Sequence, residues 1–366
     1  MTKQYFQRFL AQYRPFKSYW NYEDGCVLTG CRQMYAATGG TLYADFVLDY
    51  LTMRVKPDGT IPSYLTGKHC LDSFNSGRSL FFAKELTHDP RYEKAIRWQA
   101  SQITAHPRTE SGMPWHKGIY PQQVWIDGVY MTAPFFAEYA AQCGDVRICE
   151  EIGRWFTYLE KHLRDAKTGL YYHALDESRT QRWANPDTGL SQSFWLRGEG
   201  WFLMALCDTA AVLPPEQEQL RNHLEAILRD AVSALLLYRR PDGLLCQVID
   251  RPSLAENYTE TSGNLMTAYA LMRGAELRML PDDCFETGLA MLETVKREKL
   301  CETASGTVLC GICRSAGLGG AEGRDGSTAY YLSEPVVSDD PKGVGVLMMA
   351  EAVRLRSQCA ISKARG

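Results

Sequence analysis

Residues 148–174 read ICEEIGRWFTYLEKHLRDAKTGLYYHA, and this stretch holds one complete unit of the pattern that decides the fold. Its first part places Ile148, Ile152, Trp155 and Leu159 at helical spacing, which predicts a helix with one apolar face. Its last part, KTGLYYHA, sets a glycine before a run of apolar and aromatic residues. This combination is typical of a turn followed by a short extended segment.

The turn with its extended segment recurs along the chain. The copies are PDGTIPSY at Gly59, SGMPWHKG at Gly112, KTGLYYHA at Gly169, PDGLLCQV at Gly243 and SGTVLCGI at Gly306. They lie roughly sixty residues apart, a period that leaves room for two helices between successive copies. The interval before the copy at Gly243 contains a second clear helical face, formed by Leu224, Ile227, Leu228, Ala231 and Leu235.

Units of this length fit about six times into 366 residues. Helical hairpins repeated with such a period form either an open superhelix or a closed ring. Helices that are apolar enough to pack against an outer ring of helices and also to line the centre of the ring favour the closed arrangement. We therefore predict an all-α fold, an (α/α)6 barrel of six helical hairpins with short β pieces in the loops between them. No Ser- or Gly-rich linker interrupts the pattern, so residues 1–366 are expected to form a single catalytic domain.

The bulk composition argues against several partners. Hydrophobic residues make up 45% of the chain and charged residues 23%, as is usual for a soluble globular enzyme. The formal net charge of −3 gives no electrostatic reason to expect nucleic acid or an anionic membrane as a partner. Residues 1–20 predict an amphipathic helix ending near Pro15 instead of a secretion signal, and no apolar run is long enough to span a bilayer. We expect a cytoplasmic protein of undetermined oligomeric state.

The cysteines and glycines do not form the motifs of a metal or cofactor site. The twelve cysteines are dispersed, and Cys310 with Cys313 forms a lone CxxC pair without the second pair or the histidines of a zinc site. The sequence has no Gly-x-Ser-x-Gly elbow, no dinucleotide-binding glycine fingerprint and no phosphate-binding loop. We therefore expect reduced thiols, no metal and no cofactor.

Chemically suggestive residues concentrate at junctions between loops and helices. The stretch PWHKGIYPQQVWIDGVYMTAPFF, residues 114–136, places Lys117, Trp125 and Asp127 directly before an apolar helical pattern. An acid at the mouth of a helix, among aromatic and cationic groups, suits a pocket for a polar ring, and Asp127 is the candidate reacting group. In HCLDSFNSGRSLFF, Asp72 is a second candidate, although an acid before a helix is often only an N-cap.

Two further segments complete the candidate pocket. Residues 171–201 contain His173, Arg197 and Trp201, and the last two share one helix face because they are four residues apart. A guanidinium beside an indole suits a sugar carboxylate, whereas an arginine at a helix end beside a core tryptophan is the structural alternative. Residues 317–345, GLGGAEGRDGSTAYYLSEPVVSDDPKGVG, are glycine-rich and predict a lid or pocket rim in which Asp340 and Lys342 are structural.

Taken together, these segments resemble the unsaturated rhamnogalacturonyl hydrolases of glycoside hydrolase family 105. The resemblance runs from about Trp20 to near Arg354. It rests on LDSFNSGR, on WHKGIYPQQVWIDGVYM, on YYHALDES with WANPDTGLSQSFWLRGEGW, and on DGSTAYYLSEPVVSDDPKGVG. It implies an (α/α)6 barrel that acts on small oligosaccharides with a 4,5-unsaturated uronic acid at the non-reducing end, such as pectin lyases leave.

The resemblance also implies roles for individual residues. The catalytic aspartate of the family's Trp-x-Asp-Gly motif matches Asp127, and its second acid matches Asp72. Substrate-binding positions match His173 and Arg197, the stacking indoles match Trp125 and Trp201, and the lysine of Trp-His-Lys matches Lys117. Asp127 would protonate C4 of the double bond and then accept a proton from the water that attacks C5. This requires that burial and a nearby negative charge raise the pKa of Asp127.

Three other functions are compatible with parts of the pattern. An unsaturated glucuronyl hydrolase acting on glycosaminoglycan or algal fragments would use the same chemistry. A sugar 2-epimerase shares the barrel but relies on a pair of histidines, and here His173 is the one that is well placed. A helical scaffold without catalytic activity would not need an acid, a histidine, an arginine and indoles in one constellation.

Overall fold

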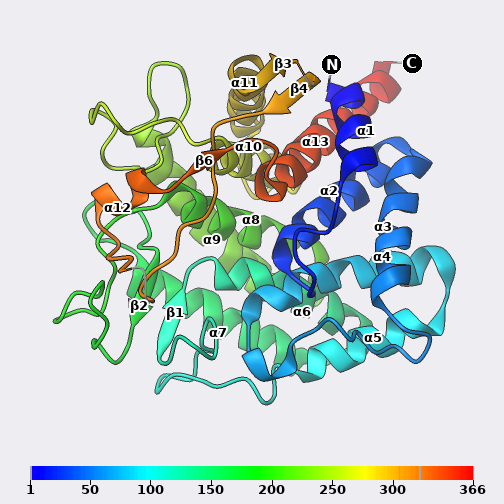
Figure 1. Ribbon diagram of the computed structural model, residues 1–366, viewed down its shortest axis with the longest axis horizontal. Helices are drawn as coiled ribbons and strands as arrows, with labels where there is room; N and C mark the ends of the chain where they lie inside the picture. The colour runs from blue at the N-terminus through cyan, green and yellow to red at the C-terminus, as the bar shows by residue number, and fades with distance from the viewer. Residues whose placement is uncertain (1, 305, 321–322, 366) are drawn as a thin grey trace.

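The computed structural model of the protein describes residues 2–304, 306–320 and 323–365. Helices dominate it (Figure 1). Six of them form an inner ring: α2 (Tyr22–Thr38), α4 (Arg78–Thr87), α6 (Gly128–Cys143), α8 (Leu196–Val212), α10 (Thr261–Glu276) and α13 (Pro341–Arg365). The outer helices are α1 (Thr2–Gln12), α3 (Thr41–Arg54), α5 (Pro90–Ser101), α7 (Val146–Leu163), α9 (Glu218–Leu235) and α11 (Asp282–Lys299).

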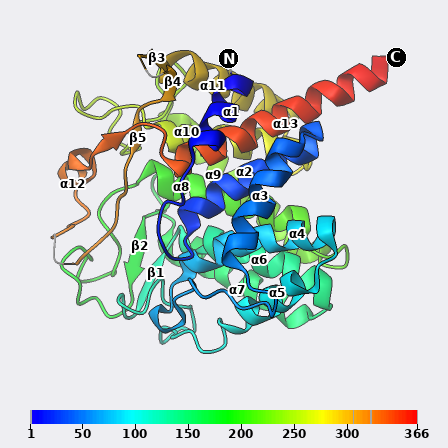
Figure 2. The ribbon, with the colours of Figure 1, turned by 45° about the vertical axis from the view of Figure 1, so that its right-hand side comes forward.

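The inner ring is closed. Helix α13 contacts both α2 and α10, α8 contacts α10 and α6, and α6 contacts the 3-10 helix η2 (Leu71–Gly77), which leads into α4 and also touches α2. Figures 1 and 2 show the result, with the first and last helices of the chain side by side and both termini at the same end. The (α/α)6 barrel predicted from the repeat is confirmed, and the open superhelix is wrong.

Two glycines bring together the helices that close the ring. A Cβ atom on Gly30 of α2 would lie 2.6 Å from the carbonyl oxygen of Gly345 in α13, and a Cβ on Gly345 would overlap the backbone of Cys26. Any side chain at either position would push the two helices apart. The first and last helices of the barrel therefore pack backbone against backbone.

The two rings differ in how much of each helix is buried. Outer helix α9 buries Leu224, Ile227, Leu228, Ala231 and Leu235, the face predicted from the sequence. In α7, Ile152, Trp155 and Leu159 are buried as predicted, and Ile148 is partly buried. Inner helix α10 is buried on nearly all sides, because it packs against the outer ring and also lines the barrel centre. One apolar stripe suffices outside, whereas an inner helix must be apolar all round.

The repeated turns connect each outer helix to the next inner one. Gly59, Gly112, Gly169, Gly243 and Gly306 all have positive φ, between 74° and 106°, the conformation that glycine adopts without steric cost. Short antiparallel strand pairs accompany these loops, as predicted: β1 (Gln123–Trp125) with β2 (Ala174–Asp176), β3 (Leu300–Thr303) with β4 (Gly306–Leu309), and β5 (Ile312–Cys313) with β6 (Val336–Val337).

The starts of the inner helices gather polar residues at one end of the barrel. Asn21 caps α2, Asp127 precedes α6, Arg197 lies in the first turn of α8, and Glu260 caps α10. The positive end of each helix dipole points toward this end, which suits anionic groups. The functional site is therefore expected there.

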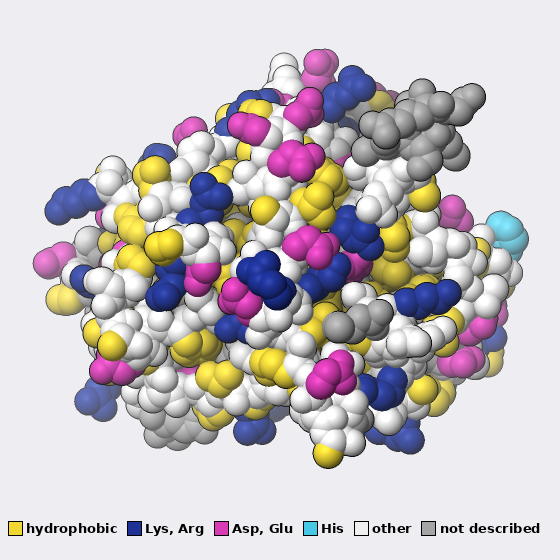
Figure 3. Space-filling model, turned by 90° about the horizontal axis from the view of Figure 1, so that it is seen from above, with side chains coloured by type: hydrophobic (Ala, Val, Ile, Leu, Met, Phe, Trp, Pro, Cys, Tyr) yellow, Lys and Arg dark blue, Asp and Glu magenta, His cyan; other side chains and the backbone are white. Residues whose placement is uncertain are grey.

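The surface seen from above carries acidic, basic and hydrophobic side chains intermingled, without a wide area of one charge (Figure 3). Across the ranges that the structure covers, none of the helices has the length and apolar character needed to cross a membrane.

Candidate active site

Asp127 stands at the junction between strand β1 and helix α6. Although its backbone is in the N-cap position, its side chain makes no capping hydrogen bond. The residue keeps partial exposure, yet its Oδ1 is buried and has no hydrogen-bond partner among the described residues. A buried carboxylate oxygen without a partner is costly unless a ligand satisfies it. Asp127 is thus not explained as a structural cap.

The surroundings raise the pKa of Asp127 to about 7. Burial is the largest cause, and the negative charge of Asp72 is the second. The positive charges of Lys117 and Arg197 oppose the shift without cancelling it. At neutral pH a large fraction of Asp127 is therefore protonated, as a general acid requires. The direction of this shift is the one expected from the sequence.

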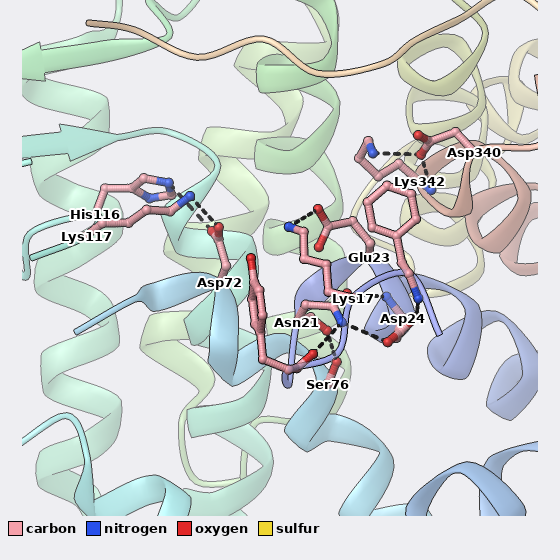
Figure 4. Close-up of polar contacts among 12 residues, drawn as sticks. Lys17, Asn21, Glu23, Asp24, Asp72, Ser76, His116, Lys117, Asp340 and Lys342 are labelled. Carbon is pink, nitrogen blue, oxygen red and sulfur yellow. Dashed lines mark hydrogen bonds and ion pairs between the residues drawn. The ribbon is translucent and has the colours of Figure 1, made fainter. Parts of the chain in front are cut away.

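Asp72 lies within η2 and forms an ion pair. Its Oδ2 is 2.7 Å from Nζ of Lys117, across 45 residues of sequence (Figure 4). Burial alone would raise the pKa of Asp72, but the positive charge of Lys117 outweighs burial and holds that pKa below its ordinary value. The two acids consequently differ at neutral pH: Asp72 is ionised, while Asp127 is partly protonated. Such a separation of pKa values is typical of paired catalytic acids.

Three flat rings lie parallel beside these acids. The ring of His116 is 4.6 Å from that of Trp125 and tilted by 7°, and Tyr120 lies 4.9 Å from Trp125 at 10°. Burial lowers the pKa of His116 to about 3. The imidazole is neutral, and its Nε2 lies 3.6 Å from Oδ1 of Asp72, which is too far for a hydrogen bond. Trp125 is only 5% exposed, and it supports the site wall instead of offering a free face to a sugar.

His173 is buried and held by a tyrosine. Its Nδ1 lies 2.7 Å from the hydroxyl of Tyr331, while its Nε2 has no partner among the described residues. Burial lowers the pKa of His173 to about 3, and the positive charge of Arg197 acts in the same direction. His173 is therefore neutral, and Nε2 is available to a ligand.

Arg197 and Trp201 are placed differently from the sequence interpretation. Nη1 of Arg197 donates to the carbonyl of Cys313 at 2.6 Å and to the Ser262 hydroxyl at 3.1 Å. The guanidinium is buried and already bonded, so it is not an open seat for a carboxylate, although its Nε lacks a partner among the described residues. Trp201 is 2% exposed and stacks on Tyr130, which makes it a core residue below the site.

A cavity of about 410 Å³ opens beside Asp72, and Asp127 is not one of the residues that line it. Asp72 and Lys117 line it together with a second ion pair, in which Nζ of Lys17 is 2.6 Å from Oε1 of Glu23 (Figure 4). Tyr22, at the start of α2, is also in the lining. Sequence reasoning missed Lys17, Tyr22 and Glu23, because that segment has no motif. The signal that could have identified these residues is their position at the junction between a loop and a helix, where the other candidate residues also lie.

The glycine-rich segment of residues 317–345 contributes one residue directly. Its helix α12 (Thr328–Ser333) brings Tyr331 onto His173, and residues 321–322 of the segment lie outside the described residues. Asp340 and Lys342 form a buried ion pair of 2.7 Å and are structural, as predicted. Within the described ranges, no group of three His, Cys, Asp or Glu residues could hold a metal ion.

Comparisons with known proteins decide the family. The sequence profile of Glycosyl Hydrolase Family 88 matches residues 1–358. The chain belongs to this glycoside hydrolase family. A family 105 glycoside hydrolase of C. acetobutylicum is 39% identical and superposes with a TM-score of 0.92, covering 97% of this chain and 99% of that one. The resemblance to family 105 seen in the sequence is thereby confirmed.

Two curated relatives and one further solved structure are also similar to this hydrolase. A protein of Agrobacterium fabrum is 43% identical over 62% of this chain and 98% of its own length. The unsaturated rhamnogalacturonyl hydrolase YesR of Bacillus subtilis is 25% identical over 70% of this chain and 72% of its own. The unsaturated glucuronyl hydrolase of Bacillus sp. GL1 shares the fold, with a TM-score of 0.62 at 14% identity over 92% of this chain and 86% of that one.

Proposed function

We propose that this glycoside hydrolase removes a 4,5-unsaturated uronic acid from the non-reducing end of oligosaccharides produced by rhamnogalacturonan lyases. The observation that carries the proposal is Asp127, whose buried Oδ1 has no partner among the described residues and whose pKa is raised to about 7 by burial and by the negative charge of the ion-paired Asp72. An ordinary glycosidic bond needs an acid and a separate base or nucleophile. An unsaturated uronide needs one carboxyl group that first donates and then accepts a proton.

The reaction follows from the electronic structure of the substrate. The C4=C5 double bond is an enol ether, because C5 carries the ring oxygen. Asp127 donates its proton to C4, and positive charge develops at C5 and the ring oxygen. Water then adds to C5 while the Asp127 carboxylate accepts its proton, which restores the acid. The resulting hemiketal opens and releases the linked sugar.

The surrounding groups support this sequence of steps. Atoms without partners among the described residues belong to Asp127, His173, Arg197 and His116, which are linked around the acid by ring contacts and charge interactions. Unsatisfied polar atoms in a pocket are expected where a ligand supplies the missing hydrogen bonds. We assign Nε2 of His173 to a ring oxygen or the carboxylate of the uronide. Lys17 and Lys117, which line the cavity, supply positive charge for that carboxylate.

The leaving sugar is the finer part of the proposal. YesR, whose name specifies rhamnogalacturonyl substrates, supports rhamnose as the residue linked to the uronide. The second candidate is an unsaturated glucuronyl hydrolase, as the Bacillus sp. GL1 enzyme is described. At 14% identity that likeness concerns the fold, so it ranks second.

Loss of the ultraviolet absorbance of the double bond tests the proposal. The purified enzyme is given unsaturated rhamnogalacturonan disaccharide and, in parallel, unsaturated chondroitin disaccharide. Asp127→Asn should abolish nearly all turnover, whereas Asp187→Asn, an exposed control, should leave it unchanged. Turnover by Asp127→Asn would move the chemistry to another residue. Turnover of the chondroitin substrate alone would establish the glucuronyl alternative.

A further inference from the structure

The hairpin of strands β3 and β4 holds two thiols in contact with each other. Sγ of Cys301, in β3, lies 2.7 Å from Sγ of Cys310, the residue that follows β4. A disulfide bond is about 2.05 Å long, so less than about 1 Å of movement separates the two sulfur atoms from a bond. Both cysteines are free in the structure, and both are partly exposed, so a small reagent can reach them.

The pairing of the two strands places both thiols on one face of the hairpin. Cys301 pairs with Val308, and Cys310 lies two residues further along, so the side chains of both cysteines point to the same side. The backbone N–H of Cys310 donates to the carbonyl of Lys299 at 2.9 Å, which continues the pairing beyond β4. The same carbonyl also accepts from both thiols, at 3.2 Å from Cys310 and 3.7 Å from Cys301. The contact between the sulfur atoms therefore follows from the backbone of the hairpin.

The sequence motif suggests a different partner for Cys310. Cys310 and Cys313 form the CxxC pair, but Cys313 lies in β5 and is buried. The backbone of Cys313 is bonded on both sides, since its N–H donates to Oε1 of Glu260 at 2.9 Å and its carbonyl accepts from Nη1 of Arg197 at 2.6 Å. The thiol that meets Cys310 is instead that of Cys301, nine residues earlier in the chain.

The segment from Cys310 to Cys313 connects the hairpin to the inner ring. Oγ1 of Thr261, the first residue of α10, donates to the carbonyl of Cys310 at 2.7 Å. The backbone N–H of Thr261 donates to the carbonyl of Gly311 at 3.0 Å. A covalent bond from Cys310 to Cys301 would therefore tie β3 to the start of α10.

We propose that Cys301 and Cys310 are an oxidation site, at which a low-molecular-weight disulfide converts the two thiols into a disulfide that stabilises the junction between the hairpin and α10. Burial and the neighbouring Cys301 thiol raise the pKa of Cys310 to about 11, so Cys310 is a poor first nucleophile and Cys301 reacts first.

The oxidation proceeds by two successive exchanges. The Cys301 thiolate attacks one sulfur of the reagent, which forms a mixed disulfide and releases one small thiolate. The Cys310 thiolate then attacks Sγ of Cys301 and expels the second small thiolate. The two cysteine protons end on the two small thiols, so the protein loses two hydrogen atoms and the reagent gains them.

Glutathione disulfide is the probe for this site. The reduced native enzyme is incubated with it, the remaining thiols are alkylated, and the linkage is mapped by mass spectrometry. Trypsin leaves both cysteines in one fragment between Lys299 and Arg314, so a second cleavage after Glu302 is needed to separate them. Wild type should then yield the two fragments joined by a disulfide, and dithiothreitol should reverse the linkage.

Matched variants and thermal unfolding complete the test. Oxidised wild type should have a Tm about 3 °C above that of the reduced enzyme, because the bond closes a short loop. Cys310→Ser should show no rise and retain the mixed disulfide on Cys301, whereas Cys301→Ser should show neither product. Cys313→Ser should keep the linkage. Cys284→Ser removes a partly exposed thiol of α11 and should match wild type.

Two results would overturn the oxidation site. One is a wild-type enzyme that keeps both thiols free or stops at the mixed disulfide, and the other is a linkage that persists in Cys310→Ser. A linkage that forms in wild type without a change in Tm would overturn its stabilising role. These measurements use no carbohydrate substrate, so their outcome is independent of the proposed function.

Discussion

Nζ of Lys117 and Oδ2 of Asp72, 2.7 Å apart, form the ion pair that sets the charge beside Asp127. Burial opposes the positive charge of Lys117, but Asp72 outweighs burial and raises the pKa of the lysine. In return, Lys117 lowers the pKa of Asp72 and also that of Asp127. One lysine therefore acts on both acids.

Removal of this lysine should shift the pH dependence of the reaction. In Lys117→Met the pKa of Asp72 rises, so activity that needs ionised Asp72 is lost at a higher pH on the acidic side. The pKa of Asp127 rises as well, so the alkaline limb, located near pH 7 in wild type, also moves upward. Both limbs of kcat/KM against pH should shift in the same direction, and kcat/KM should fall about tenfold or more.

Lys117→Arg is the matched control, because it keeps a positive charge beside Asp72. Its pH profile should stay close to that of wild type. An alkaline limb that remains in place in Lys117→Met would show that Lys117 does not act on Asp127.

The raised pKa of Asp127 also makes the native state sensitive to pH. A group with a higher pKa in the folded state than in the unfolded state favours folding at low pH, and this contribution is lost as the pH rises through the folded value. Between about pH 4 and pH 7 the free energy of unfolding should therefore fall. Asp127→Asn, which cannot ionise, should be more stable than wild type at pH 8, by about 1–3 kcal/mol.

Denaturant unfolding at pH 5 and pH 8 measures this difference. Glu199→Gln is the control, because burial raises the pKa of Glu199 to about 8 and its carboxylate accepts the backbone N–H of Tyr171. Glu199→Gln should also gain stability at high pH, but it should keep its activity, since the partner of its carboxylate, the backbone N–H of Tyr171, is not assigned to the substrate. Equal stability of Asp127→Asn and wild type at both pH values would contradict the raised pKa.

Arg197 should matter for stability as much as for binding. It lies 3.9 Å from Glu260, which caps α10 and accepts the backbone N–H of Cys313 at 2.9 Å. Arg197→Met leaves that buried carboxylate without its cation and should cost about 3–5 kcal/mol in the free energy of unfolding. The double variant Arg197→Met/Glu260→Gln should recover much of the loss, because no buried charge is then left unpaired. An unstable double variant would show that the bond from Arg197 to the carbonyl of Cys313 is the main contribution.

The sequence predicted those parts of the molecule that depend on local pattern. The positive-φ glycines, such as Gly169, and the apolar face of α9 follow from turn chemistry and helical periodicity, and together they imply the barrel. The ion pair between Lys117 and Asp72 could not be predicted from the sequence, because it depends on how two loops that are distant in sequence pack together. The sequence left the place of Trp201 open between a sugar-binding indole and a core residue, since an indole that stacks on a sugar and one that stacks on Tyr130 have the same spacing from Arg197.

Tyr331 illustrates a residue that only the tertiary structure assigns. It lies in a glycine-rich segment 158 residues from His173, and its hydroxyl is 2.7 Å from Nδ1 of that histidine. This bond fixes the orientation of the neutral imidazole and leaves Nε2 for the substrate. Tyr331 is thus a positioning residue, which acts through His173.

Tyr331→Phe should lower kcat about tenfold, because a misplaced imidazole no longer orients the uronide beside Asp127. The alkaline limb of the pH profile should remain near pH 7, since the groups that set the pKa of Asp127 are unchanged. Tyr330→Phe is the matched control: that hydroxyl accepts the N–H of Gly317 at 2.9 Å and donates to Glu334 at 2.6 Å, away from the histidine. Steady-state kinetics on the unsaturated disaccharide distinguish a structural role of Tyr331 from a role in positioning His173. If the two phenylalanine variants lose the same activity, Tyr331 serves only to order its segment, whereas a loss confined to Tyr331→Phe assigns it to His173.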